Sequence, residues 1–128
     1  MRYEEFVESV RQRGGMQSYE EAENATRSTL AALGKALPDA EATQLSEELP
    51  EGLGDRLRRQ PSEPEKLSDP NDFLHRVGQG EGARAPEVEN HVRAVMAVLG
   101  EAAGPDRVQS LRSQLPDGFS RFFQPAGS

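Results

Sequence analysis

The chain has 128 residues, of which 34% are hydrophobic, and this size predicts one domain, or two very small units that share a core. The sequence contains no cysteine, which excludes disulfides, thiolate zinc sites, iron–sulfur clusters and a cysteine nucleophile. The formal net charge of −7 argues against nucleic acid or an anionic membrane as a partner, and no stretch offers the roughly 18 apolar residues of a membrane span.

The chain begins with MRYEEFVESV, which carries acidic residues where a secretion signal would carry basic residues and an apolar run. We therefore expect a cytoplasmic protein. The apolar residues of this segment recur at helical spacing: Tyr3, Phe6, Val7 and Val10. They predict a short helix that ends at the glycine pair Gly14 and Gly15.

Three further helices are predicted in the first half of the chain. The longest opens with a capping box formed by Ser18 and Glu21. Its apolar face consists of Tyr19, Ala22, Thr26, Leu30, Leu33 and Leu37. The next helix begins near Pro38 and carries Ala42, Leu45 and Leu49, and a fourth, short helix after Pro50 carries Leu53 and Leu57.

The same four segments recur in the second half of the chain. Residues 21–57 align with residues 87–123 at an offset of 66, and the segments before residue 20 align at an offset of 67. A Leu-Pro-acid-Gly stretch occurs near the end of both units and predicts a turn between their third and fourth helices. The apolar residues of the second unit again fall at helical spacing: Phe73, Leu74 and Val77; Val88, Val92, Met96 and Leu99; Val108, Leu111 and Leu115; Phe119, Phe122 and Phe123. We predict an internal duplication.

The sequence therefore predicts an all-α fold, in which two tandem copies of a four-helix unit pack into one compact helical domain. The first helical repeat covers residues 1–60, a polar and proline-rich linker covers 61–69, and the second repeat covers 70–128. Each repeat alone is about 60 residues long and would bury little surface. We expect the two repeats to share one core, with pseudo-twofold symmetry between them.

This order of segments resembles a known prokaryotic family, the domain of unknown function 2267. The pieces that carry the resemblance are Ala25-Thr26-Arg27, Leu33-Gly34 and Glu48-Leu49-Pro50. The resemblance covers nearly the whole chain and implies an all-helical, internally duplicated fold. It implies no activity and no catalytic residues. The second repeat departs from the first by having His91-Val92-Arg93 in place of Ala25-Thr26-Arg27.

Arg27 and Arg93 are the first candidates for a ligand-binding site. Each lies at the edge of its apolar stripe, one helical turn after Glu23 or Glu89. Two guanidinium groups near the twofold axis could hold a carboxylate or a phosphate. The alternative is an ion pair at the boundary of the core, in which the arginine stem covers apolar surface.

Asn24, Asn90 and Phe122 are candidates for contact with a partner. The two asparagines occupy equivalent positions and point away from the apolar stripes. They could contact a partner or another helix of the same chain, or their agreement could be chance. Phe122 and Phe123 cannot easily face one core from a single short helix, so Phe122 belongs either to a docking surface for a second chain or to a cover over the other repeat.

The sequence indicates no metal site and no cofactor. His75 and His91 lie in different helices without a third ligand at suitable spacing, and we expect them to be ordinary surface or boundary residues. The acidic runs YEEAE and SEELPE lack the loop of a calcium site, and we interpret them as solvated faces.

Two hypotheses for function remain open. The first is a small cytoplasmic interaction or regulatory module without catalysis, which acts on an unknown protein partner or by self-association. The second is a ligand-binding or enzymatic domain with an anionic ligand at the junction of the repeats, near Arg27 and Arg93. The first is favoured because the sequence offers no nucleophile–base set or cofactor motif. The preference for Arg over Lys reflects either GC-rich coding or adaptation to salt.

Overall fold

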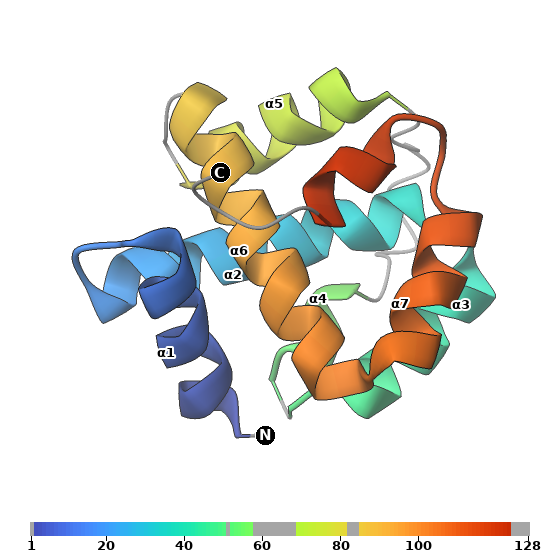
Figure 1. Ribbon diagram of the computed structural model, residues 1–128, viewed down its shortest axis with the longest axis horizontal. Coiled ribbons are helices and arrows are strands. Elements are labelled where there is room, and N and C mark those ends of the chain that lie inside the picture. The colour runs from blue at the N-terminus through green and yellow to red at the C-terminus, as the bar shows by residue number, and fades with distance from the viewer. Residues whose placement is uncertain (1, 51, 58–68, 82–84, 124–128) are drawn as a thin grey trace.

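The computed structural model describes residues 2–50, 52–57, 69–81 and 85–123. The helices within these ranges are α1 (Tyr3–Gly14), α2 (Tyr19–Ala36), α3 (Asp39–Glu48), α4 (Gly54–Leu57), α5 (Pro70–Glu81), α6 (Ala85–Ala103), α7 (Pro105–Gln114) and the 3-10 helix η1 (Phe119–Phe123) (Figure 1). The described ranges contain no strand, and the predicted all-α fold is confirmed. The predicted linker lies outside them except for Asp69.

The helix starts and stops follow from local chemistry. The Ser18 hydroxyl accepts a hydrogen bond from the Glu21 backbone N–H at 3.1 Å, which caps α2 as predicted. The Glu21 carboxylate reaches back one residue further than a capping box requires, to the N–H of Gln17 at 3.3 Å. Gly15 ends α1 with a φ of 63°, in the left-handed region that favours glycine.

Each Leu-Pro-acid-Gly stretch forms a turn between helices. The Pro50 carbonyl accepts a hydrogen bond from the Leu53 N–H at 3.0 Å, and the Pro116 carbonyl accepts one from the Phe119 N–H at 3.3 Å. Gly52 in the first turn has a φ of 95° and Gly118 in the second has a φ of 93°, as expected for the third residue of a type II turn. The segment after the first turn is one turn of α-helix, whereas the segment after the second is 3-10 helix.

The long helices α2 and α6 contact each other and form the centre of the molecule. Figure 1 shows α6 crossing α2, with α3 and α7 side by side at one end. Both α1 and α5 pack against the two central helices, so each of these shorter helices contacts its own half of the chain and the other half.

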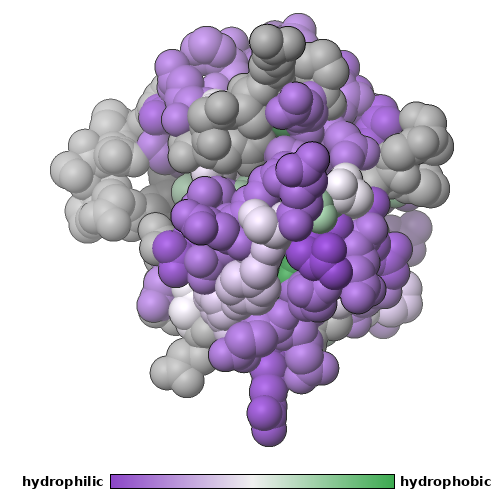
Figure 2. All heavy atoms as spheres, turned by 90° about the vertical axis from the view of Figure 1, so that its left-hand side faces the viewer, coloured by the Kyte–Doolittle hydropathy of each residue, from purple (hydrophilic) through white to green (hydrophobic). Residues whose placement is uncertain are grey.

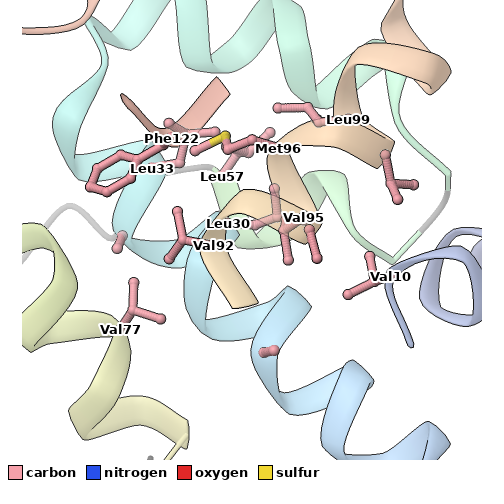
Figure 3. Packing of buried hydrophobic residues seen from close by; sticks show 14 of the residues in the cluster. Val10, Leu30, Leu33, Leu57, Val77, Val92, Val95, Met96, Leu99 and Phe122 are labelled. Carbon is pink, nitrogen blue, oxygen red and sulfur yellow. The ribbon is translucent and has the colours of Figure 1, made fainter. Parts of the chain in front are cut away.

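Buried residues of both halves form one hydrophobic cluster. Figure 3 shows side chains of α2 and α6 meeting inside it, among them Leu30, Leu33, Val92 and Met96. The helices follow the same order in the two halves, with lengths of 12, 18 and 10 residues in the first and 12, 19 and 10 in the second. Duplication as the origin of this order stays a prediction from the sequence. None of the described helices has the length and apolar character to cross a membrane.

Candidate functional site

Arg27 lies on the exposed side of α2 and is held by two neighbours. Its Nε donates a hydrogen bond to the Tyr3 hydroxyl at 3.2 Å, and its Nη2 lies 3.5 Å from Glu23 Oε2. The Tyr3 hydroxyl in turn donates to Glu23 Oε2 at 2.6 Å. Burial and the bond to Glu23 raise the pKa of Tyr3 above its usual value. Tyr3, Glu23 and Arg27 thus form a closed triad that joins α1 to α2.

Arg93 lies at the equivalent position of α6 and has a different environment. Its Nη2 donates a hydrogen bond to Glu89 Oε2 at 2.6 Å. The other oxygen of Glu89 lies 3.5 Å from Nη2 of Arg121, which comes from η1. Arg27 and Arg93 therefore bind separate partners at separate helix contacts, rather than one shared ligand site.

The Nε atoms of Arg93 and Arg121 are buried and meet no hydrogen-bond acceptor within the described part of the chain. A buried N–H without an acceptor is unfavourable, because it loses its bonds to water and gains none in return. The Arg121 guanidinium also lies over the Phe122 ring, 5.2 Å from its centre. The group formed by Glu89, Arg93 and Arg121, named here the α6–η1 cluster, holds two cations and one anion.

The two predicted partner-binding asparagines lie in different surroundings. The Asn90 side chain donates a hydrogen bond to the Gly14 carbonyl at 2.9 Å, at the C-terminal end of α1. It thereby satisfies one of the carbonyls that the end of a helix leaves unpaired. Asn24 is exposed on α2. Of the three interpretations left open above, the structure supports contact with another helix of the same chain for Asn90.

Phe122 is fully buried, so its ring offers no surface to a second chain in this fold. It stacks on Phe73 of α5 at 5.5 Å and meets Phe119 edge-on at 5.5 Å. Edge-on and offset aromatic pairs of this kind stabilise cores beyond the area they bury. Of the two interpretations left open for Phe122, the docking surface is wrong because the ring is buried. The 3-10 geometry of η1 turns Phe119 and Phe122 inward and leaves Phe123 half-buried.

The two histidines differ, and the expectation for His91 was wrong. His75 is exposed and lies 3.2 Å from the Gln79 amide. His91 is only 6% exposed, and its Nε2 lies 3.5 Å from Glu21 Oε2 of α2. His91 aligns with Ala25, which is fully buried. The small apolar residue at the aligned position was therefore the sign in the sequence that His91 could be buried. The described ranges hold no group of three side chains suited to a metal ion.

The sequence did not reveal the contact between α3 and α7. The Arg107 Nη1 donates to Glu41 Oε1 at 2.9 Å, and the same guanidinium binds Glu48. The Ser110 hydroxyl donates to Glu41 at 3.1 Å. The hydrogen bond to Glu48 is the main reason that the pKa of Arg107 is raised above its usual value. This cluster ties the two halves together.

A groove of about 450 Å³ runs between α6 and α7. Its lining residues are Ala97, Gly100, Glu101, Pro105, Val108, Gln109 and Arg112. The half-buried Ala97, Gly100 and Val108 form its floor, and the other four residues are exposed at its rim. The face of the molecule at the side of α1 is, by contrast, mostly hydrophilic (Figure 2). Among the described residues, Tyr19 is the exposed large hydrophobic side chain.

Comparison with known proteins agrees with the resemblance seen in the sequence. No curated protein matches the chain. The model of a family described as uncharacterized conserved protein (DUF2267) matches residues 3–122, which is most of the chain. The chain therefore belongs to the DUF2267 family, to which no activity is assigned.

Proposed function

We propose that this protein is a small, non-catalytic interaction module of the cytoplasm, and that it binds a segment of a second protein in the groove between α6 and α7. The groove is the observation that carries this proposal. Its floor of Ala97, Gly100 and Val108 offers apolar contact, and small side chains let a chain segment approach closely. Such grooves between helices are a common mode of peptide recognition.

The rim of the groove favours a partner segment with charges beside its apolar residues. Glu101 and Arg112 carry opposite charges at this rim. Glu101 also pairs with Arg13 of α1, and the Arg112 guanidinium lies 5.7 Å from the centre of the Phe123 ring. The partner that fits is a segment with small or apolar side chains in the middle and charged residues at its ends.

The pairing of Arg27 and Arg107 supports a binding role over catalysis. Each of these two arginines holds a carboxylate of the same chain. The groove itself is lined by one carboxylate and one guanidinium, which lack a nucleophile between them. The net charge of −7 supports a protein partner over nucleic acid.

A photo-crosslinking residue at Gln109, on the rim of the groove, tests the proposal in the cells that make the protein. Thr43 occupies the equivalent exposed position on α3 and is the matched control. We expect one discrete crosslinked protein from position 109 and none from position 43. Ala97→Trp, which fills the groove, should abolish this crosslink. Equal crosslinking at both positions, or a product with twice the mass of the chain, would contradict the proposed partner.

A further inference from the structure

We propose that the α6–η1 cluster is a binding site for a tetrahedral oxyanion of the phosphate type, and that Glu89 occupies this site when the anion is absent. The inference does not depend on the groove between α6 and α7. It rests on the charges of the cluster, on the use of its N–H donors and on a comparison with the first repeat.

The charge of the cluster is positive although the protein is acidic. Arg93 and Arg121 bring two positive charges and Glu89 brings one negative charge, and the longer of their two contacts is 3.5 Å. The protein as a whole carries a net charge of −7. Two guanidinium groups therefore meet one carboxylate, and the excess positive charge can attract a second anion or one that replaces the Glu89 carboxylate.

In each arginine of the cluster, Nη2 has an acceptor and Nε has none among the described residues. Nε and Nη2 of an arginine point in one direction and together bind two oxygens of an oxyanion. Glu89 places one oxygen at Nη2 of Arg93 and the other at Nη2 of Arg121, so neither Nε receives an acceptor from it. A carboxylate has two oxygens and cannot fill both pairs of donors. A phosphate has four oxygens and can.

The first repeat contains the same glutamate and arginine without this feature. There the Tyr3 hydroxyl accepts the hydrogen bond from Arg27 Nε. At the offset of 67 the residue equivalent to Tyr3 is Pro70, which has no hydroxyl, and at the offset of 66 the residue equivalent to Arg121 is Asp55. Around the paired glutamate and arginine, the second repeat thus has one more cation, Arg121, and lacks the hydroxyl acceptor that Tyr3 provides in the first repeat.

Glu89 can leave the site because its side chain is 30% exposed on the surface of α6. The Arg93 side chain is 17% and the Arg121 side chain 39% exposed, whereas the Nε atoms of both are buried while Glu89 is in place. Arg121 is also held by its contact with the Phe122 ring. Glu89 and the Phe122 ring already hold the two guanidinium groups in place, which reduces the loss of freedom when an anion replaces Glu89.

The test is an NMR titration of the whole chain with inorganic phosphate, in which the arginine Nε–H signals are followed at constant ionic strength. We expect saturable shifts for Arg93 and Arg121 and none for Arg27. Acetate at the same ionic strength should not reproduce them. Glu89→Gln removes the competing charge and should tighten phosphate binding about fivefold or more. Glu23→Gln, the equivalent change in the first repeat, should leave the affinity unchanged.

A parallel titration with O-phosphoserine separates the two sources of the same chemistry. Tighter binding of inorganic phosphate assigns the site to a free anion, and tighter binding of phosphoserine assigns it to a phosphorylated side chain; both support the site. Arg93→Lys keeps the charge but loses the paired donors, and should weaken binding. Absence of saturable shifts in both the unchanged protein and Glu89→Gln, or equal gains in Glu89→Gln and Glu23→Gln, would overturn the proposal.

Discussion

Glu41 of α3 and Arg107 of α7 form an ion pair with 2.9 Å between Oε1 and Nη1, and they lie 66 positions apart, which is the offset that aligns the two halves of the chain. A twofold axis brings equivalent positions of two copies face to face. The contact between these residues is therefore what a pseudo-twofold arrangement of two repeats would produce. At these two aligned positions, one half of the chain has a carboxylate and the other half has a guanidinium.

Removal of the Arg107 charge should destabilise the protein. Arg107→Met leaves the Glu41 carboxylate, whose side chain is only 10% exposed, without its cation, and we expect a loss of about 1–2 kcal/mol in the free energy of unfolding. Urea denaturation measures this value. The control is Arg13→Met, because Arg13 and Glu101 form an exposed pair whose loss should change stability by less than about 1 kcal/mol. Equal effects of the two substitutions would argue against a structural role for the α3–α7 contact.

Asn90 should contribute more to stability than Asn24, although the two are equivalent in the sequence. Asn90→Ala removes the hydrogen bond to the Gly14 carbonyl and should reduce the free energy of unfolding by about 1 kcal/mol. Asn24→Ala changes an exposed residue and should stay within about 0.5 kcal/mol. Thermal unfolding of both variants checks the difference. A loss for Asn90→Ala no larger than that for Asn24→Ala would mean that the hydrogen bond to Gly14 does not stabilise the fold.

Gly34 and Gly100 are also equivalent in the sequence, but only Gly34 should resist a methyl group. A Cβ at Gly34 would lie 2.1 Å from the backbone oxygen of Leu57, which cannot move without displacing α4. Gly34→Ala should therefore cost about 3 kcal/mol or more.

A Cβ at Gly100 would meet a methyl group of Val108 at 2.9 Å, and that side chain can shift. Alanine is also the better helix former by about 1 kcal/mol, so Gly100→Ala should change stability by less than about 1 kcal/mol. Chemical denaturation of the two variants measures the contrast. Similar losses at both positions would show that α4 does not approach α2 as closely as described.

An alkaline titration should show the raised pKa of Tyr3 in the triad of Tyr3, Glu23 and Arg27. The chain contains two tyrosines and no tryptophan, so tyrosinate absorbance follows Tyr3 and Tyr19 without interference. Both should titrate above pH 10. Burial is the main cause of the raised pKa of Tyr3, whereas for the exposed Tyr19 partial desolvation and the charges of Glu23 and Glu4 raise the pKa. Glu23→Gln removes a charged acceptor and should move the pKa of Tyr3 back toward 10, and Tyr3→Phe identifies which transition is which.

The same shift predicts how stability depends on pH. Because the pKa of Tyr3 is higher in the folded than in the unfolded chain, its contribution to stability is complete below pH 10 and is lost as the pH rises through the folded pKa. Tyr3→Phe should therefore reduce the loss of stability above pH 10. An unchanged pH profile in Tyr3→Phe would contradict the raised pKa.

The sequence by itself determined the helices and most of the core-facing residues, because helical periodicity, capping residues and proline or glycine breaks are local properties of the chain. Tyr19 is an exception, since it belongs to the predicted apolar face of α2 but is exposed. It predicted the capped start of α2, the end of α1 at Gly15 and the turns after Pro50 and Pro116. The tertiary structure decided the rest. Asn90 binds the end of α1 whereas the equivalent Asn24 is exposed, His91 is buried, and Phe122 lies in the core. The physical reason is that the contacts of these side chains come from helices distant in the sequence, and the period of a helix carries no information about which distant helix will cover a given face.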